Sequence, residues 1–137
     1  MNASSQVFSY QDVNPYCFEA AIAPHLAAEY AGVVINRSTI ESIYAKHKVK
    51  SDIVIIEGAG GWKVPLDNNS GFDDLAFALD APVILVVGMK LGCINHALLT
   101  EESILSKGCQ IAGWIGNDLS GNFIEIDENI NTLKKLK

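Results

Sequence analysis

The chain lacks the features of a membrane protein, a secreted protein or a nucleic-acid-binding protein. Its longest apolar run, Ala81 to Met89, fits one buried strand and is far too short to span a bilayer. The first residues are polar, which predicts no signal peptide. A net charge of −6 argues against a basic surface for nucleic acid. The three cysteines form no CxxC pair, which predicts reduced thiols in a cytoplasmic protein.

Length and composition predict one globular domain over residues 1–137. The chain is 49% hydrophobic and 19% charged, which is ordinary for a protein with a packed core. We find no internal repeat and no low-complexity linker. A run of charged residues at Lys46–Lys50 is typical of a solvated helix end, where cations suit the helix dipole.

Apolar runs alternate with stretches of helical periodicity along the chain. Buried strands are predicted over Ile53–Glu57, Pro82–Gly88 and Gln110–Asn117. Helices are predicted over Glu19–Tyr30, Ser38–Val49, Gly71–Leu79, Ile94–Lys107 and Phe123–Lys137. Ser38, with Glu41 three residues on, has the spacing of a capping box, and Gly108 stands where a C-terminal glycine belongs. This alternation predicts a three-layer α/β fold, a mostly parallel sheet with helices on both faces. Three strands are few for such a sheet, so we expect it to be incomplete, with exposed edges prone to self-association.

The first predicted strand delivers a carboxylate into a glycine loop. Glu57 ends the strand, and Gly58, Ala59 and Gly60 follow it. Ligands of open α/β sheets bind at the carboxyl ends of the strands, and glycines let the backbone approach a bulky anion. The pattern favours Mg²⁺ held between Glu57 and a nucleotide phosphate. It equally fits a tight strand-to-loop turn in which Glu57 is simply solvated.

A second candidate anion site follows the second strand. Gly92 precedes a helix start, so the N–H groups of Cys93, Ile94 and Asn95 would point outward together and bind a carboxylate or phosphate. Lys90 would add a cation. The alternative is ordinary helix capping, which has the greater weight on local grounds.

The third predicted strand ends in a polar pair, Asn117 and Asp118. A side-chain amide both donates and accepts hydrogen bonds, which suits the edge of an adenine ring. The pair also fits an Asx-turn, and local sequence favours that alternative.

Taken together, these stretches are similar to dethiobiotin synthetase, the ATP-dependent ligase of biotin synthesis. The resemblance covers about Val13 to Leu119 and rests on four blocks, VNPYCFEAAIAPH, IIEGAGGWKVPL, PVILVVGMKLGCINHALLT and IAGWIGNDL. The third block is the most specific, because it matches across strand, loop and helix without a gap. The resemblance implies a fold like that of the P-loop NTPases.

The resemblance also implies a reaction and a set of roles. In this family 7,8-diaminononanoate captures CO₂ as a carbamate, ATP activates the carbamate, and the second amine closes a ureido ring. By motif, Glu57 matches a Mg²⁺ ligand, and the following glycine loop matches the segment along the nucleotide. Asn117 and Asp118 match positions that contact the base. The stretch from Gly92 to Asn95 matches a pocket for the substrate carboxylate, offered across the interface of a homodimer.

The sequence departs from the family pattern in more than one respect. It contains no Gly-Lys-Ser or Gly-Lys-Thr, the P-loop ending that supplies a lysine to the phosphates and a hydroxyl to Mg²⁺. Phe123–Lys137 also fails to match the segment that closes over adenine. We expect a piece of a longer enzyme, and two alternatives stay open: a second polypeptide that supplies the P-loop, or a degenerate homologue that only binds.

A different class of function also fits a parallel sheet with an acid-ended strand. Cobyrinic-acid amide synthases and ParA-like partition ATPases belong to the same wider P-loop family. The GCINHALLT helix start favours the biotin branch, because a pocket for the carboxylate of a diamine has no obvious use in partitioning. Salt-sensitive binding to DNA would favour a partition ATPase, and the acidic charge speaks against it.

Overall fold

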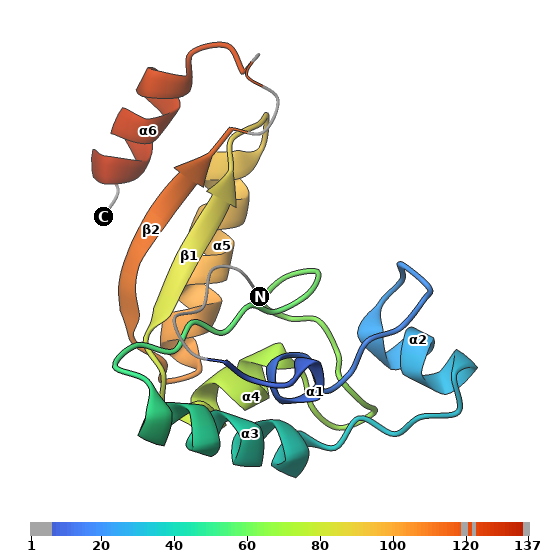
Figure 1. The fold of residues 1–137 in the computed structure, drawn as a ribbon. Coiled ribbons are helices and arrows are strands. Elements are labelled where there is room, and N and C mark those ends of the chain that lie inside the picture. The colour runs from blue at the N-terminus through green and yellow to red at the C-terminus, as the bar shows by residue number, and fades with distance from the viewer. Residues whose placement is uncertain (1–6, 119–120, 122, 136–137) are drawn as a thin grey trace. The chain divides into compact units, whose positions relative to one another are not determined.

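The computed structural model describes residues 7–118, 121 and 123–135. In chain order its elements are α1 (Tyr10–Val13), α2 (Pro24–Tyr30), α3 (Arg37–Lys50), α4 (Phe72–Leu79), β1 (Val83–Gly88), α5 (Cys93–Ser106), β2 (Ile111–Asn117) and α6 (Ile126–Lys135), as labelled in Figure 1. They fall into two compact units, Met1–Leu79 and Asp80–Lys137. Each unit is described by itself.

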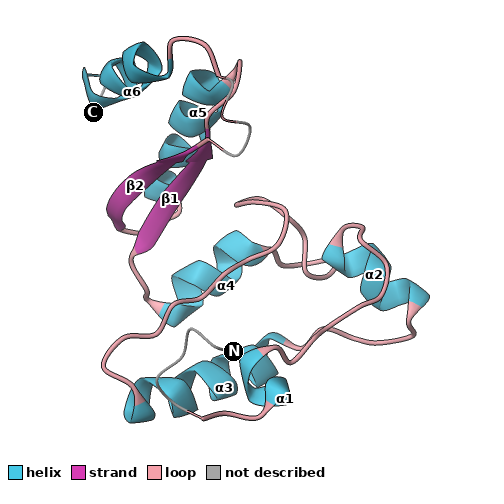
Figure 2. Ribbon diagram, turned by 45° about the horizontal axis from the view of Figure 1, so that its top comes forward, coloured by secondary structure: helices cyan, strands magenta, loops and turns pink. Residues whose placement is uncertain are grey.

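The second unit contains a parallel β-α-β arrangement. Strands β1 and β2 pair in parallel, with Leu85 opposite Trp114 and Gly88 opposite Asn117, and α5 connects them (Figures 1 and 2). One buried core cluster of this unit consists of Val87, Met89, Cys93, Ala97 and Leu133. The predicted α/β class with a parallel sheet is therefore confirmed.

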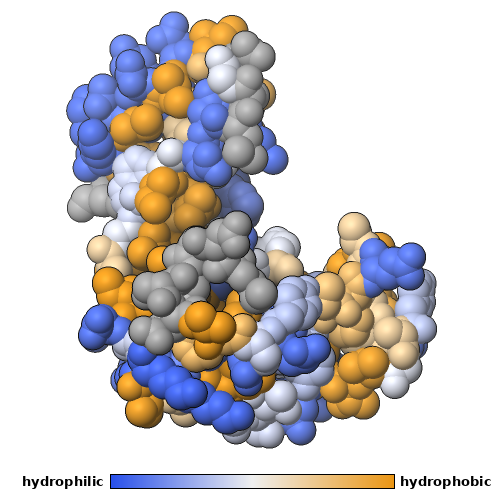
Figure 3. Space-filling model, viewed as in Figure 1, coloured by the Kyte–Doolittle hydropathy of each residue, from blue (hydrophilic) through white to orange (hydrophobic). Residues whose placement is uncertain are grey.

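Core side chains come from only part of this sheet. Val87 of β1 is 6% exposed, whereas Ile84 and Val86 are each 56% exposed. Ile115 of β2 is 53% exposed. The strands thus keep apolar side chains that no described residue buries, and Figure 3 shows apolar residues, in orange, at the surface of the face in view.

The prediction of a strand over Ile53–Glu57 is wrong. These residues have no strand assignment and form part of the long loop between α3 and α4 (Figure 2). Ile53 and Ile55 are 80% and 88% exposed. A strand needs a neighbour for its N–H and C=O groups, and no described residue pairs with this stretch. The apolar run alone does not make a strand, because its N–H and C=O groups have no hydrogen-bond partners on a neighbouring strand among the described residues.

Two predicted helix starts also differ. Helix α2 begins at Pro24 and not at Glu19, because proline suits the first helical position and the residue before it is pushed out of the helical region. Helix α3 begins at Arg37 and is capped by Asn36, whose Oδ1 accepts from the Ser38 N–H at 3.0 Å. The expected capping box is absent.

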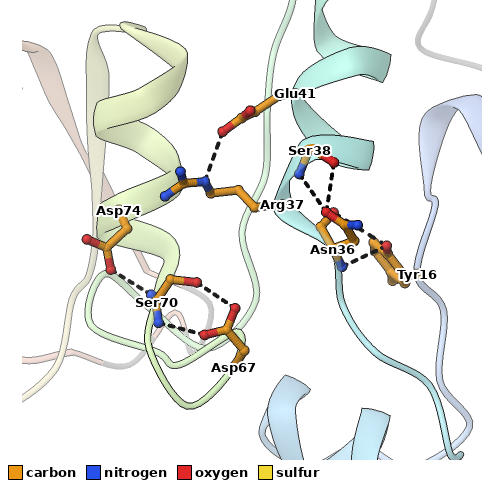
Figure 4. A network of polar contacts seen from close by, with 9 residues as sticks. Tyr16, Asn36, Arg37, Ser38, Glu41, Asp67, Ser70 and Asp74 are labelled. Carbon is orange, nitrogen blue, oxygen red and sulfur yellow. Dashed lines mark hydrogen bonds and ion pairs between the residues drawn. The ribbon is translucent and has the colours of Figure 1, made fainter.

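The polar contacts at this helix start are drawn in Figure 4. Glu41, expected to close the capping box, instead pairs with Arg37 one helical turn earlier, at 2.9 Å. The Tyr16 hydroxyl accepts from the Asn36 N–H at 2.9 Å and so ties the capping residue to an earlier segment of the same unit.

The remaining elements agree closely with the sequence. Helices α4 and α5 and strands β1 and β2 begin within one residue of their predicted starts. Gly108, predicted to end the helix, has φ of +85° directly after the C-cap of α5. Helix α6 lies within the stretch 123–137, of which residues 136–137 are outside the described part. The short helix α1 was not predicted. None of the described helices is long and apolar enough to cross a membrane.

Candidate functional site

The glycine loop after Glu57 is exposed and has an unusual backbone. Glu57, Gly58 and Gly60 are all solvent-exposed. Gly60 has φ of +83° and Gly61 has φ of +124°, in the region that glycine adopts readily and other residues avoid. The three glycines therefore present main chain that carries no side chain of its own, next in sequence to a carboxylate.

Glu57 offers one carboxylate and not a cluster. Among the described residues, no group of three or more His, Cys, Asp or Glu side chains could hold a metal ion. Mg²⁺ in nucleotide sites takes one or two protein carboxylates and completes its shell with phosphate oxygens and water. A single exposed carboxylate beside a glycine loop fits Mg²⁺ carried by a nucleotide, and does not fit an all-protein metal cage.

The start of α5 is built by a tight turn. Gly92 has φ of +91° and ψ of −4°, and the Cys93 N–H donates to the Lys90 carbonyl at 2.9 Å. These values identify a type II turn with glycine at its third position. The Gly92 carbonyl then accepts from the His96 N–H at 3.0 Å, which is the first hydrogen bond of the helix.

This turn corrects the predicted anion site in one detail. The Cys93 N–H, expected to point outward, is used by the turn, and Cys93 itself is buried at 4% exposed. The N–H groups of Ile94 and Asn95 have no acceptor among the described residues. The helix start therefore offers two donors and the positive end of the dipole, with Lys90 exposed nearby in sequence.

The end of β2 lies beside this turn. Asn117 is the register partner of Gly88, and its carbonyl accepts from the Met89 N–H at 2.8 Å. The structure therefore brings Asn117 and the start of α5 to the same edge of the sheet, the carboxyl ends of parallel strands where such folds bind ligands. Asn117 is exposed. Asp118 Oδ1 accepts from the Gly121 N–H, three residues along the chain, at 3.1 Å.

The predicted site residues are divided between the two units. Glu57 to Gly60 belong to the first, whereas Gly92 to Asn95, Asn117 and Asp118 belong to the second. An ion pair that was not predicted lies close to the glycine loop, between Lys63 Nζ and Asp73 Oδ2 at 2.7 Å. No short motif or helical spacing marks this pair, because its members lie ten residues apart across a loop.

The loop beyond this pair is organised by Asp67. Its carboxylate accepts from the N–H groups of Asn69 and Ser70, both at 2.7 Å, and from the Ser70 hydroxyl at 2.8 Å. The bond from the Asn69 N–H, followed by the bond from the Ser70 hydroxyl, holds the pKa of Asp67 below its ordinary value. Figure 4 shows part of this turn next to the start of α4.

Comparison with known proteins agrees with the resemblance. A family model described as an AAA domain matches residues 3–137. Proteins named ATP-dependent dethiobiotin synthetase BioD are 45% identical over 94% of the chain in Pseudomonas paraeruginosa, 46% over 90% in Aromatoleum aromaticum and 44% over 98% in Photobacterium profundum. The matches cover 57%, 55% and 61% of those proteins, so the chain spans just over half the length of the curated relatives it matches.

A match along nearly the whole chain takes in both the glycine loop and the turn that begins α5. The chain belongs to the AAA domain family, and its relatives there include ATP-dependent dethiobiotin synthetases.

Proposed function

We propose that this chain forms part of a dethiobiotin synthase that uses ATP and Mg²⁺ to convert 7,8-diaminononanoate and CO₂ into dethiobiotin. The observation that carries the proposal is the exposed carboxylate of Glu57 followed by a glycine loop with positive φ angles. The identity of about 45% to proteins of that name over most of the chain supports it.

Each candidate residue has a physical role in this reaction. Phosphoryl transfer depends on neutralising charge and holding the reactants in line. Mg²⁺, when bound, would neutralise charge on the nucleotide phosphates. Glu57 would supply its carboxylate ligand, and the main chain of Gly58, Ala59 and Gly60 would pass along the phosphates without steric hindrance. Asn117 would present its amide to the edge of the base.

The helix start would act on the substrate at a distance from the reacting amines. The N–H groups of Ile94 and Asn95 would hold the carboxylate of the diamine, helped by the helix dipole. Fixing the far end of a long, flexible substrate lowers the entropy that the reaction must lose. We further propose a cytoplasmic homodimer in which this helix start serves the active site of the neighbouring subunit.

Isosteric replacement of Glu57 tests the metal role. Glu57→Gln keeps the shape and removes the charge, so the Kd for Mg·ATP measured by titration calorimetry rises about tenfold or more. Asp52→Asn is the matched control, because Asp52 is also an exposed acid of the same loop. Turnover of diaminononanoate, CO₂ and ATP to dethiobiotin is assayed in parallel. Equal Kd values for Glu57→Gln and the control, or Glu57→Gln turnover above about a tenth of wild type, would refute the proposal.

A further inference from the structure

The segment that follows the glycine loop folds back on itself before α4. The Phe72 N–H donates to the Val64 carbonyl at 3.0 Å, and Pro65 forms an isolated antiparallel bridge with Gly71. The Leu66 N–H donates to the Ser70 carbonyl at 2.9 Å. Residues 64–72 therefore form a small closed turn, and it ends at the start of α4.

Both ends of the glycine loop contact the first turn of α4. At the beginning of the loop, a Cβ built on Gly58 would lie 3.4 Å from the ring of Phe72, so the ring packs against the Gly58 backbone. At its end, the Lys63 ammonium is paired with the Asp73 carboxylate at 2.7 Å. Two adjacent residues of one helical turn thus hold a loop whose own glycines leave it conformationally free.

The ion pair is asymmetric in its exposure. The side chain of Asp73 is only 8% exposed, whereas that of Lys63 is 64% exposed. Among the described residues, Asp73 is the only charged residue that is buried. Burying a carboxylate raises the free energy of the folded state unless a positive group compensates its charge. The Asp73 carboxylate therefore favours a fixed position of the Lys63 ammonium beside it. The flexible lysine is therefore held by a rigid partner in a helix.

We propose that Lys63 and Asp73 are a positioning pair, which fixes the end of the glycine loop and thereby places Glu57 for Mg·ATP. The proposal rests on the proposed function for its link to nucleotide binding. Gly60 and Gly61 lie in the segment between Glu57 and Lys63, and both have positive φ angles. Without an anchor after them, these two glycines would let the loop sample many conformations.

The first experiment measures the loop itself and needs no nucleotide. Backbone amide order parameters from NMR are compared between wild type and Lys63→Met, which removes the ammonium that pairs with Asp73. The amides of Gly58, Gly60 and Gly61 are expected to fall from near the rigid value of about 0.85 to below about 0.6. Lys63→Arg, which keeps a cation, restores the wild-type values. Lys48→Met, on α3, is the matched control and leaves the loop unchanged.

Asp73→Asn provides an independent perturbation from the other side of the pair. It keeps the shape of Asp73 and removes the charge that attracts Lys63. The same loop amides are expected to lose order, while those of α3 keep their values. Unchanged order in Lys63→Met would overturn the proposal. So would loss of order in Lys63→Met that Lys63→Arg does not restore.

The second experiment connects the loop to the ligand. The Kd for Mg·ATP in Lys63→Met is expected to rise about tenfold, and Lys63→Arg is expected to stay within twofold of wild type, about 0.4 kcal/mol. If Lys63→Met loses loop order but binds Mg·ATP as tightly as wild type, the positioning role is refuted. If the wild-type chain shows no affinity for Mg·ATP, or Glu57→Gln has none of its expected effect, the proposed function fails, whatever the loop measurements show.

Discussion

Replacing Gly92 by alanine tests whether backbone conformation alone determines the start of α5. Gly92 has φ of +91° in the turn that the Cys93 N–H closes on Lys90. A Cβ added there would meet no heavy atom within 4 Å, so crowding contributes nothing. The whole effect of Gly92→Ala then comes from forcing an L residue into a conformation that it avoids.

The magnitude follows from two opposing terms. A left-handed backbone costs an L residue about 1–2 kcal/mol. Exchanging glycine for alanine also lowers the conformational entropy of the unfolded chain, which raises the free energy of unfolding by about 0.4–1 kcal/mol. We therefore expect Gly92→Ala to lower the free energy of unfolding by about 1 kcal/mol. Gly92→Asn is expected to cost less, because asparagine tolerates this region better.

The assay is urea unfolding followed by tryptophan fluorescence. The chain has two tryptophans, one in each unit, so Trp62→Phe leaves Trp114 of β2 as the reporter for the unit that contains α5. Gly88→Ala is the matched control: a Cβ there also meets nothing within 4 Å, and Gly88 is not among the glycines with positive φ. A free energy of unfolding for Gly92→Ala within about 0.3 kcal/mol of the Gly88→Ala value would refute the reasoning.

Three further outcomes are expected. Leu133→Ala lowers the free energy of unfolding by about 2–4 kcal/mol in urea titration, because Leu133 is fully buried, whereas Leu99→Ala, 57% exposed, changes it much less. Gly71→Ala lowers the free energy of unfolding by about 1–3 kcal/mol, because its Cβ would lie 2.7 Å from Asp73 Oδ1 and 3.0 Å from the Val64 carbonyl oxygen; an unchanged melting temperature contradicts this. Asp67 titrates below its ordinary pKa of 3.8 in carboxyl NMR spectra. Its stabilising effect is present above that value and is lost as pH falls through the lowered pKa; titration at or above 3.8 contradicts the argument.

Local sequence signals predicted the second unit well. The run that forms β1, the periodic stretch that forms α5 and the glycine after α5 each act within a few residues, so their outcome depends little on the rest of the chain. Gly92 belongs with them, because a type II turn requires positive φ at one place and the sequence offers glycine there.

Signals that depend on a partner were less informative. Ile53–Glu57 has the composition of a buried strand, but strand formation needs a neighbouring chain, and none of the described residues supplies one. At α3, Ser38 and Glu41 have the spacing of a capping box, but Asn36, two residues earlier, is the residue that caps the helix. The start of α2 did have a local signal in Pro24, because proline is favoured at the first position of a helix.

The candidate site divides in the same way. The sequence by itself determined which residues carry chemistry: a carboxylate before three glycines, a glycine before a helix and an amide at the end of a strand. Tertiary structure alone decided that the Cys93 N–H closes a turn, that Asn117 lies beside the start of α5, and that Asp73 is buried against Lys63. Residue type and local backbone preference are encoded within a few positions. Burial and hydrogen-bond partners depend on which distant segments meet.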